Sequence, residues 1–239
     1  MTDVISNTGA AATMADNPAW YPVIPISDLG NASSIALGFI KQAELAVWRA
    51  PNGVVQAWEN RCPHRGMRFT LGRIIQGRLS CAYHGWEFEA GSGRCSAIPA
   101  HPDMPVPRNV CARKFQAAEV NGIVWVAHEH TAEAPPATAA HTILRSLGVR
   151  ASAAFVTRTL SDTGWRLSRH DVFDGDIGDQ QVVLYLTCVA AELVMLHVGV
   201  VDALDTMQKS RLHAGLRDLR AGIETRWQIH LAANEGEQP

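Results

Sequence analysis

The most constraining feature of this sequence is a set of two cysteines and two histidines in one short stretch. Residues 60–88 read NRCPHRGMRFTLGRIIQGRLSCAYHGWEF and carry the four side chains at the spacing C-x-H-x16-C-x2-H. Such a stretch forms a zinc site, a disulfide loop or a seat for redox-active iron. Each alternative would fix the local fold, so this stretch limits what the surrounding chain can form.

The cysteine count argues against a disulfide framework. The chain of 239 residues has five cysteines, an odd number, and two of them stand beside histidines. This usage is typical of reduced thiols in a reducing compartment. Cys95, Cys111 and Cys188 have no cysteine or histidine partner at ligand spacing, so we expect all three to be buried small side chains.

The pairing of residue types distinguishes a zinc site from an iron-sulfur site. Zinc sites use pairs of one type, C-x2-4-C and H-x3-5-H, whereas each pair here mixes one cysteine with one histidine. Two mixed loops suit a two-metal cluster in which histidines replace cysteines on one iron, as in a Rieske [2Fe-2S] centre. Cys62 and Cys81 would hold the inner iron, and His64 and His84 would hold the outer one.

The residues within the motif indicate a protein family. The stretch CPHRG followed by CAYHGWEF resembles the Rieske domain of Rieske non-haem iron oxygenases, the α subunits that hydroxylate or demethylate aromatic rings. The resemblance is specific over residues 17–130 and thin beyond them. It implies a [2Fe-2S] Rieske cluster, and Gly66 and Gly85 would let backbone amides approach the bridging sulfides.

The order of strand and turn signals predicts a mainly β chain, with a hairpin turn at Asn52-Gly53 and a hairpin of two long strands over 180–201. We expect a flexible tail over 1–16, a Rieske-type antiparallel β domain over 17–129, a linker over 130–141 and a small α+β domain over 142–239. The Ala/Pro-rich composition of HTAEAPPATAAH predicts the linker. Apolar residues from Leu204 to Trp227 predict a C-terminal helix, and a small domain could not bury its apolar face alone, so we expect this face to contact a partner subunit. By resemblance, the last domain is part of a truncated helix-grip catalytic domain.

The second half does not show the iron site of that family. Complete oxygenase α subunits hold a mononuclear iron on a D-x2-H-x4-H helix and a later aspartate, and no such helix pattern occurs here. The nearest material is SRHDVFDGDIGDQ and a later histidine, with the candidate ligands His170, Asp171, Asp174, Asp176, Asp179 and His197. Two glycines make this segment resemble a turn between strands, so we predict no mononuclear iron here.

These features leave three functional hypotheses. The first is a Rieske electron-transfer component of a multi-subunit oxygenase, an oxidoreductase subunit that is not catalytic alone. It would need an iron-bearing oxygenase subunit and an NAD(P)H-dependent flavin reductase or a ferredoxin, in a hetero- or homo-oligomer. The second is a self-sufficient small Rieske oxygenase with an atypical iron site. The third is a non-catalytic redox-sensing or structural subunit.

Charge and composition exclude other classes of partner. The formal net charge is −2, and no apolar run is long enough for a membrane span, so we expect a cytoplasmic protein that binds neither nucleic acid nor membrane. His128 and His130 read as solvated residues at a domain edge. A basic run surrounds the first half of the motif and consists of Arg61, Arg65, Arg68, Arg73 and Arg78. These side chains could hydrogen-bond loop carbonyls or steer an acidic partner to the cluster.

Overall fold

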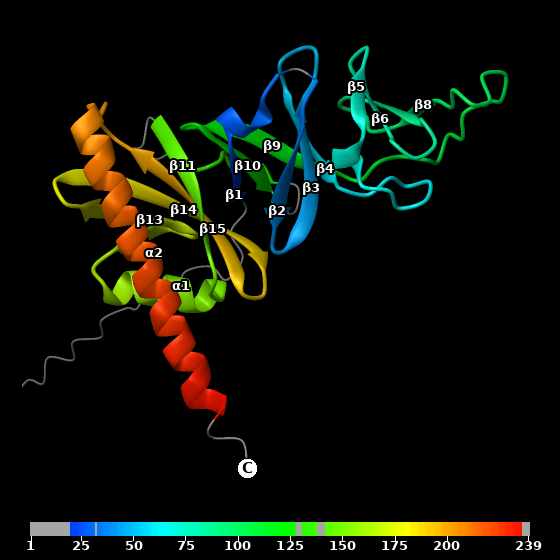
Figure 1. Ribbon diagram of the computed structural model, residues 1–239. Coiled ribbons are helices and arrows are strands. Elements are labelled where there is room, and N and C mark those ends of the chain that lie inside the picture. Colours follow the sequence, from blue (N-terminus) through cyan, green and yellow to red (C-terminus); the bar gives the residue numbers. More distant parts are fainter. Residues whose placement is uncertain (1–19, 32, 128–130, 138–141, 236–239) are drawn as a thin grey trace, which may run out of the picture.

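The computed structural model describes residues 20–31, 33–127, 131–137 and 142–235. Three antiparallel sheets and two α-helices make up these residues, as Figure 1 shows. The predicted mainly β class is confirmed, with a small α+β remainder in the second half. The predicted tail over 1–16 lies outside the described residues.

The first sheet has six strands in the order β1-β10-β9-β4-β3-β2. Several of its strands are buried on both faces, and their alternate side chains enter two different apolar clusters. Asn52 and Gly53 form the predicted turn between two of its strands, and Gly53 has φ +83°. The strands are β1 (Trp20–Pro25), β2 (Ile35–Ile40), β3 (Ala43–Arg49), β4 (Val55–Glu59), β9 (Lys114–Val120) and β10 (Ile123–Ala127). The short 3-10 helix η1 (Ile26–Leu29) follows β1.

A smaller sheet of four short strands extends from the first sheet at one end of the molecule (Figure 1). It follows the 3-10 helix η2 (Phe69–Leu71) and contains β5 (Arg73–Ile75), β6 (Arg78–Ser80), β7 (Glu87–Glu89) and β8 (Cys95–Ala97). Both cysteines of the motif belong to the apolar core beneath this sheet, among Trp58, Phe69 and Phe88. The motif is therefore anchored by packing on both of its flanks.

The second large sheet has five strands in the order β11-β15-β14-β13-β12. Its long central hairpin is the one that the sequence predicts over 180–201. The strands are β11 (Thr142–Val149), β12 (Arg166–Arg169), β13 (Val172–Ile177), β14 (Gln180–Ala190) and β15 (Leu193–Val200), with α1 (Ala153–Asp162) before β12 and α2 (Thr206–Glu235) last. Ser152 caps α1 by accepting a hydrogen bond from the Phe155 amide.

Both helices lie on one face of this second sheet and close its core (Figure 1). The helical periodicity of the C-terminal segment is confirmed by α2, but the expectation that its apolar face is left over for a partner is wrong. Leu212, Leu216, Ile223 and Trp227 are buried in the core of the same sheet. The second sheet covers these four side chains, so they give no evidence for an oligomer.

The opposite face of the second sheet packs on the first sheet. Trp125 from β10 and Tyr185 from β14 meet edge to face with ring centroids 5.9 Å apart, within a shared apolar cluster. The two large sheets therefore share an interface, with the helices outside it. The domain boundaries at 129 and 142 remain a prediction, and no helix among the described residues is long and apolar enough to cross a membrane.

Candidate iron-sulfur centre

Two loops of the same construction carry the four motif residues. The first cluster loop (residues 62–67) and the second cluster loop (residues 81–86) are each closed by a hydrogen bond from the cysteine amide to the carbonyl five residues later. Each has a second bond from the amide of its glycine back to the cysteine carbonyl, of 2.8 Å in the first loop and 3.0 Å in the second. Gly66 and Gly85 have φ of +74° and +70°, a region that favours glycine.

The inner ends of the two loops bring the two thiols together. Cys62 and Cys81 are buried, and their side chains are close enough to hydrogen-bond to each other. Burial raises the pKa of the Cys62 thiol to about 12, and the neighbouring Cys81 adds to this rise. A thiol in such surroundings ionises only when a cation beside it stabilises the thiolate, which is what a metal ion supplies.

The outer ends of the loops bring the two imidazoles together. The His64 and His84 ring centroids are 4.8 Å apart, and both side chains are partly exposed. Loss of solvation, together with His84 and Arg65, lowers the pKa of His64. The neutral form, which is the form that binds a metal, is thereby favoured.

Two aromatic rings hold the imidazoles in place, a role that the sequence pattern did not indicate. Trp86 stacks on His64 with a centroid distance of 4.1 Å and an interplanar angle of 9°, and Tyr83 stacks on His84 at 3.8 Å. Each ring limits the rotation of its imidazole. The signal was the position of both aromatic residues within two places of His84, although spacing alone does not show that Trp86 reaches across to the other loop.

The donors are thus sorted by type, thiols inside and imidazoles outside. No three Cys, His, Asp or Glu side chains within the described parts of the chain gather closely enough to hold one metal ion. A pair of thiols beside a pair of imidazoles fits a cluster of two irons with different ligands. The assignment of the four residues as ligands remains a prediction.

The acidic segment of the second sheet is arranged differently. It is not the turn that the sequence analysis expected, because β13 occupies its middle and tight turns lie on either side. The His170 Nδ1 atom lies 2.8 Å from the Asp171 carboxylate, which raises the pKa of His170. Asp174 accepts a 2.6 Å hydrogen bond from Arg166. These side chains are engaged with their neighbours, and no iron triad is formed among them.

His197 lies inside the interface between the two large sheets. Its Nδ1 atom is 2.7 Å from the Ser146 hydroxyl and its Nε2 atom is 3.2 Å from the Thr187 hydroxyl. Thr187 donates its own proton to the Pro22 carbonyl at 2.8 Å, so it accepts from Nε2 of a neutral imidazole. Burial lowers the pKa of His197 to about 4. Because both ring nitrogens have partners, His197 is a structural residue.

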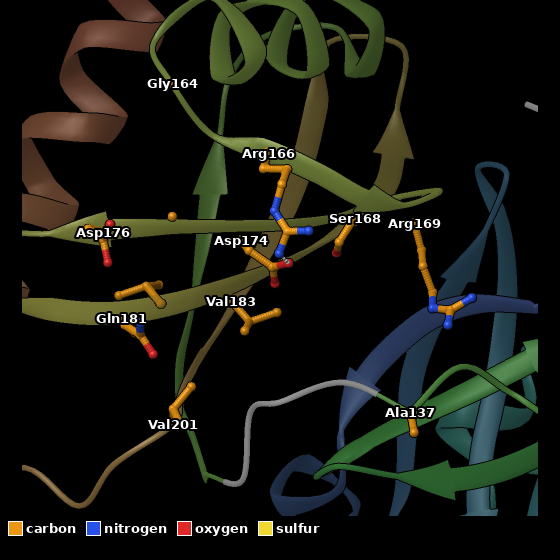
Figure 2. Close-up of a pocket in the computed structure, with 12 residues that line it drawn as sticks. Ala137, Gly164, Arg166, Ser168, Arg169, Asp174, Asp176, Gln181, Val183 and Val201 are labelled. Atoms are coloured by element: carbon orange, nitrogen blue, oxygen red, sulfur yellow. Dashed lines mark hydrogen bonds and ion pairs between the residues drawn. The ribbon is translucent and has the colours of Figure 1, made fainter. Parts of the chain in front are cut away.

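A cavity of about 550 Å³ lies on the same sheet, and Figure 2 shows its lining. Arg166 reaches across it to Asp174, while Asp176 and Gln181 line the far side. The strands that line it lie at the other end of the molecule from β5 and β6, as Figure 1 shows. The cavity is therefore separate from the cluster loops.

The remaining candidates have mixed outcomes. All five cysteines are free thiols, but only Cys95 of the three non-motif cysteines is buried; Cys188 is half-buried and Cys111 is exposed, so that expectation is wrong for two of them. Cys111 lies outside the strands, in an isolated bridge with Arg94, where no layer covers it. His128 and His130 lie outside the described residues.

Comparison with known proteins identifies the class of domain. Residues 19–111 match the family model described as "Rieske [2Fe-2S] domain". The chain therefore contains a Rieske electron-transfer domain, whose cofactor is the [2Fe-2S] Rieske cluster. The match ends before the second large sheet begins.

Curated relatives match over the same region. The chain is 42% identical over 106 residues to "Oxidoreductase NdmD" of Pseudomonas putida, covering 44% of this chain and 18% of that protein. It is 33% identical over 108 residues to the "3-chlorobenzoate-3,4-dioxygenase oxygenase subunit" of Comamonas testosteroni, covering 45% of this chain and 25% of that protein. The matched region thus spans a quarter or less of either relative.

Solved structures resemble the chain over a longer range. Dicamba monooxygenase without ligand superposes with a TM-score of 0.68 at 19% identity, covering 95% of this chain and 92% of that one. The Pseudomonas putida CBB5 protein NdmA superposes with a TM-score of 0.66 at 19% identity, covering 87% of this chain and 81% of that one. At such identity the likeness concerns the fold, which extends into the second sheet.

Proposed function

We propose that this chain is the electron-transfer component of a multi-subunit Rieske non-haem iron oxygenase. It receives electrons from an NAD(P)H-dependent flavin reductase or a ferredoxin and passes them to a mononuclear iron in a partner subunit. One observation carries the proposal: the described residues bring together a thiol pair and an imidazole pair in the two cluster loops, while His170, Asp174 and His197 of the second half are held by neighbouring side chains.

The proposed ligands divide by residue type, with the cysteines at the inner ends of the two loops and the histidines at the outer ends. Cys62 and Cys81 would hold the inner iron, and His64 and His84 the outer iron. When bound, the cluster supplies a one-electron carrier. The chain itself excludes water from the thiols, which lie in an apolar core, and keeps the two imidazoles at the surface. An electron therefore has its shortest route in and out through the imidazole edge.

The proposed partners draw support from the names of the relatives. One is called an oxidoreductase and another the oxygenase subunit of a dioxygenase, so matching Rieske domains occur in proteins with both kinds of name. A protein that keeps the cluster motif without a recognisable D-x2-H-x4-H helix has a use beside a subunit that holds the iron.

The self-sufficient alternative depends on the acidic segment and His197, and both have other roles in the fold. His197 would have to give up two hydrogen bonds within a buried interface before it could bind iron. Asp174 would have to leave Arg166. No observation in the described residues favours this alternative.

The experiment is to purify the affinity-tagged chain from its native host and to follow electron transfer in the complex by EPR. We expect a Rieske-type signal from the chain and a mononuclear iron signal from a second polypeptide. Addition of NADH and the reductase should change both signals. In a complex that contains the Cys81→Ser chain, the same addition should leave the mononuclear iron signal unchanged. Mononuclear iron bound by the isolated chain, with substrate oxidation when only a reductase is added, would overturn the proposal.

A further inference from the structure

A smaller cavity lies at the place where the two large sheets meet. Its volume is about 270 Å³, slightly below the range of roughly 300–1,000 Å³ that is typical of sites for drug-sized ligands, so it suits a small molecule. One wall comes from the first sheet and the other from the second, and no residue of the cluster loops lines it. The apolar part of its lining consists of Pro22, Phe39, Ile40, Ala153 and Leu186.

Two hairpin turns of two residues each line this cavity, one from each sheet. Lys41 and Gln42 join β2 to β3, and His170 and Asp171 join β12 to β13. Lys41, Gln42 and Asp171 have positive φ, of 46°, 69° and 62°. Such turns are ordinarily filled by Asn and Gly, which adopt positive φ at little cost. Other side chains in this conformation cluster at ligand sites, so the two turns are candidates for binding residues.

The two turns bring cationic groups together at the cavity. The Asp171 carboxylate, 2.8 Å from the His170 Nδ1 atom, raises the pKa of His170, and Lys41 is near enough to act against this rise. The Lys41 ammonium lies 5.2 Å from the centroid of the Tyr21 ring. Since Nδ1 is taken by Asp171, the His170 imidazolium has its Nε2–H left for a ligand. While His170 is protonated, two cations at the cavity face one carboxylate.

Other polar side chains of the lining are already engaged. The Gln42 side chain hydrogen-bonds to the Cys188 side chain, and the Thr187 hydroxyl donates to the Pro22 carbonyl. Burial raises the pKa of the Cys188 thiol, which therefore stays neutral. The cavity thus offers N–H donors from two cations beside a set of apolar side chains.

We propose that this cavity binds a small monocarboxylate with an apolar body. One carboxylate oxygen accepts a hydrogen bond from His170 Nε2 and the other from the Lys41 ammonium, while the body lies against Phe39 and Leu186. A phosphate or sulfate has further oxygens, which the apolar walls would leave without donors. The site contains no residue of the Rieske centre, so its occupancy does not depend on the proposed function.

The test is an NMR titration of the isotope-labelled, cluster-loaded chain with pentanoate, and with pentanamide as the neutral molecule of the same shape. We expect saturable shifts of the amide signals of the two turns and about tenfold tighter binding of pentanoate than of pentanamide at pH 6. Lys41→Gln and His170→Gln should each weaken pentanoate binding about fivefold or more. The matched controls are Lys209→Gln and His213→Gln, exposed positions on α2, which lies outside the interface between the sheets.

The pH dependence of binding separates a ligand contact from a structural role of His170. The other titratable groups of the lining are Tyr21, Lys41, Asp171 and Cys188. Deprotonation of His170 leaves Lys41 and Asp171 with no net charge, so pentanoate should bind about fivefold or more weakly at pH 8.5 than at pH 6. The His170→Gln chain should bind it equally at both pH values.

The Lys41→Gln chain decides the outcome if His170→Gln fails to fold, because Lys41 is exposed and its neighbour in the turn is already a glutamine. Pentanoate affinity equal to that of pentanamide, or equal in the parent and Lys41→Gln chains, would overturn the proposal. Shifts confined to residues outside the two turns and β14 would overturn it as well. Failure to assemble the [2Fe-2S] cluster would instead refute the proposed function, so the two failures differ.

Discussion

The two cluster loops and the second large sheet both contain histidines beside possible metal-binding side chains. The loops bring these side chains together, whereas the sheet pairs each of them with a neighbour. In the cluster loops, four donors separated by up to 22 positions in the chain meet, and backbone amides of the first loop and stacked aromatic rings hold them in place. In the second sheet, His170, Asp174 and His197 each have a hydrogen-bond or ion-pair partner that serves the fold.

The difference follows from the backbone on which the residues are placed. Tight loops with a glycine at positive φ turn a cysteine inward and a histidine outward within a few residues. A strand sends successive side chains to opposite faces, so the Phe173 ring enters the helix-side core while Asp174 reaches Arg166 on the other face. Residue types at suitable spacing therefore indicate a metal site only when the local backbone converges.

The largest effect should come from removing one thiol of the inner pair. Cys81→Ser should abolish iron and sulfide binding and lower the free energy of unfolding by about 4 kcal/mol or more, because a ligand that binds only the native state stabilises it. Metal analysis and urea unfolding measure both. Cys95→Ser removes another buried thiol and is the matched control. Retention of the full cluster by the Cys81 variant would show that Cys81 is not a ligand.

The next effect concerns acid stability and the second sheet. The pKa of His197 is about 4 in the folded chain against 6.5 when exposed, so the unfolded chain takes up a proton that the folded chain refuses. This contribution to stability is fully present above pH 6.5 and is lost as the pH falls towards 4, by about 3 kcal/mol in total.

Urea unfolding between pH 7.5 and 4.5 measures this loss. His197→Gln keeps a neutral polar group and should have a shallower pH dependence than the parent chain. His170→Gln is the control of opposite sign, because Asp171 raises the pKa of His170 and the pair stabilises the fold while His170 is protonated. Parallel pH profiles for the parent and His197→Gln chains would mean that His197 is accessible to protons.

A smaller effect should follow from removing the hydroxyl that joins the two sheets. Thr187→Val deletes the donor to the Pro22 carbonyl and the acceptor for His197, leaving two buried groups unsatisfied. We expect a loss of about 1–3 kcal/mol in unfolding free energy with the visible spectrum of the cluster unchanged. A changed spectrum would show that the interface between the sheets controls the cluster.

The smallest effect should come from the acidic segment. Asp174→Asn leaves the strand intact and weakens an exposed ion pair with Arg166, so stability should change by less than about 1 kcal/mol. Iron content per chain should not change. If this variant lost one iron while keeping the cluster spectrum, the second sheet would have to be reconsidered as a metal site.

The sequence was sufficient for the features that depend on local chemistry. The mixed cysteine-histidine spacing predicted the cofactor class, and the Asn52-Gly53 turn and the 180–201 hairpin followed from turn and strand preferences. Burial of α2 could not be predicted, because whether an amphipathic helix covers its own sheet depends on contacts far away in the chain. The stacking of Trp86 on His64 likewise depends on how the two loops meet.

The central claim is that this chain holds one Rieske centre and no other iron. Iron and acid-labile sulfide analysis of the purified chain, combined with EPR of the reduced form, tests it most directly. We predict about two irons and about two sulfides per chain, with the low average g value of a cluster that has imidazole ligands. A single zinc, a third iron, or the EPR signal of a cluster with only cysteine ligands would contradict it.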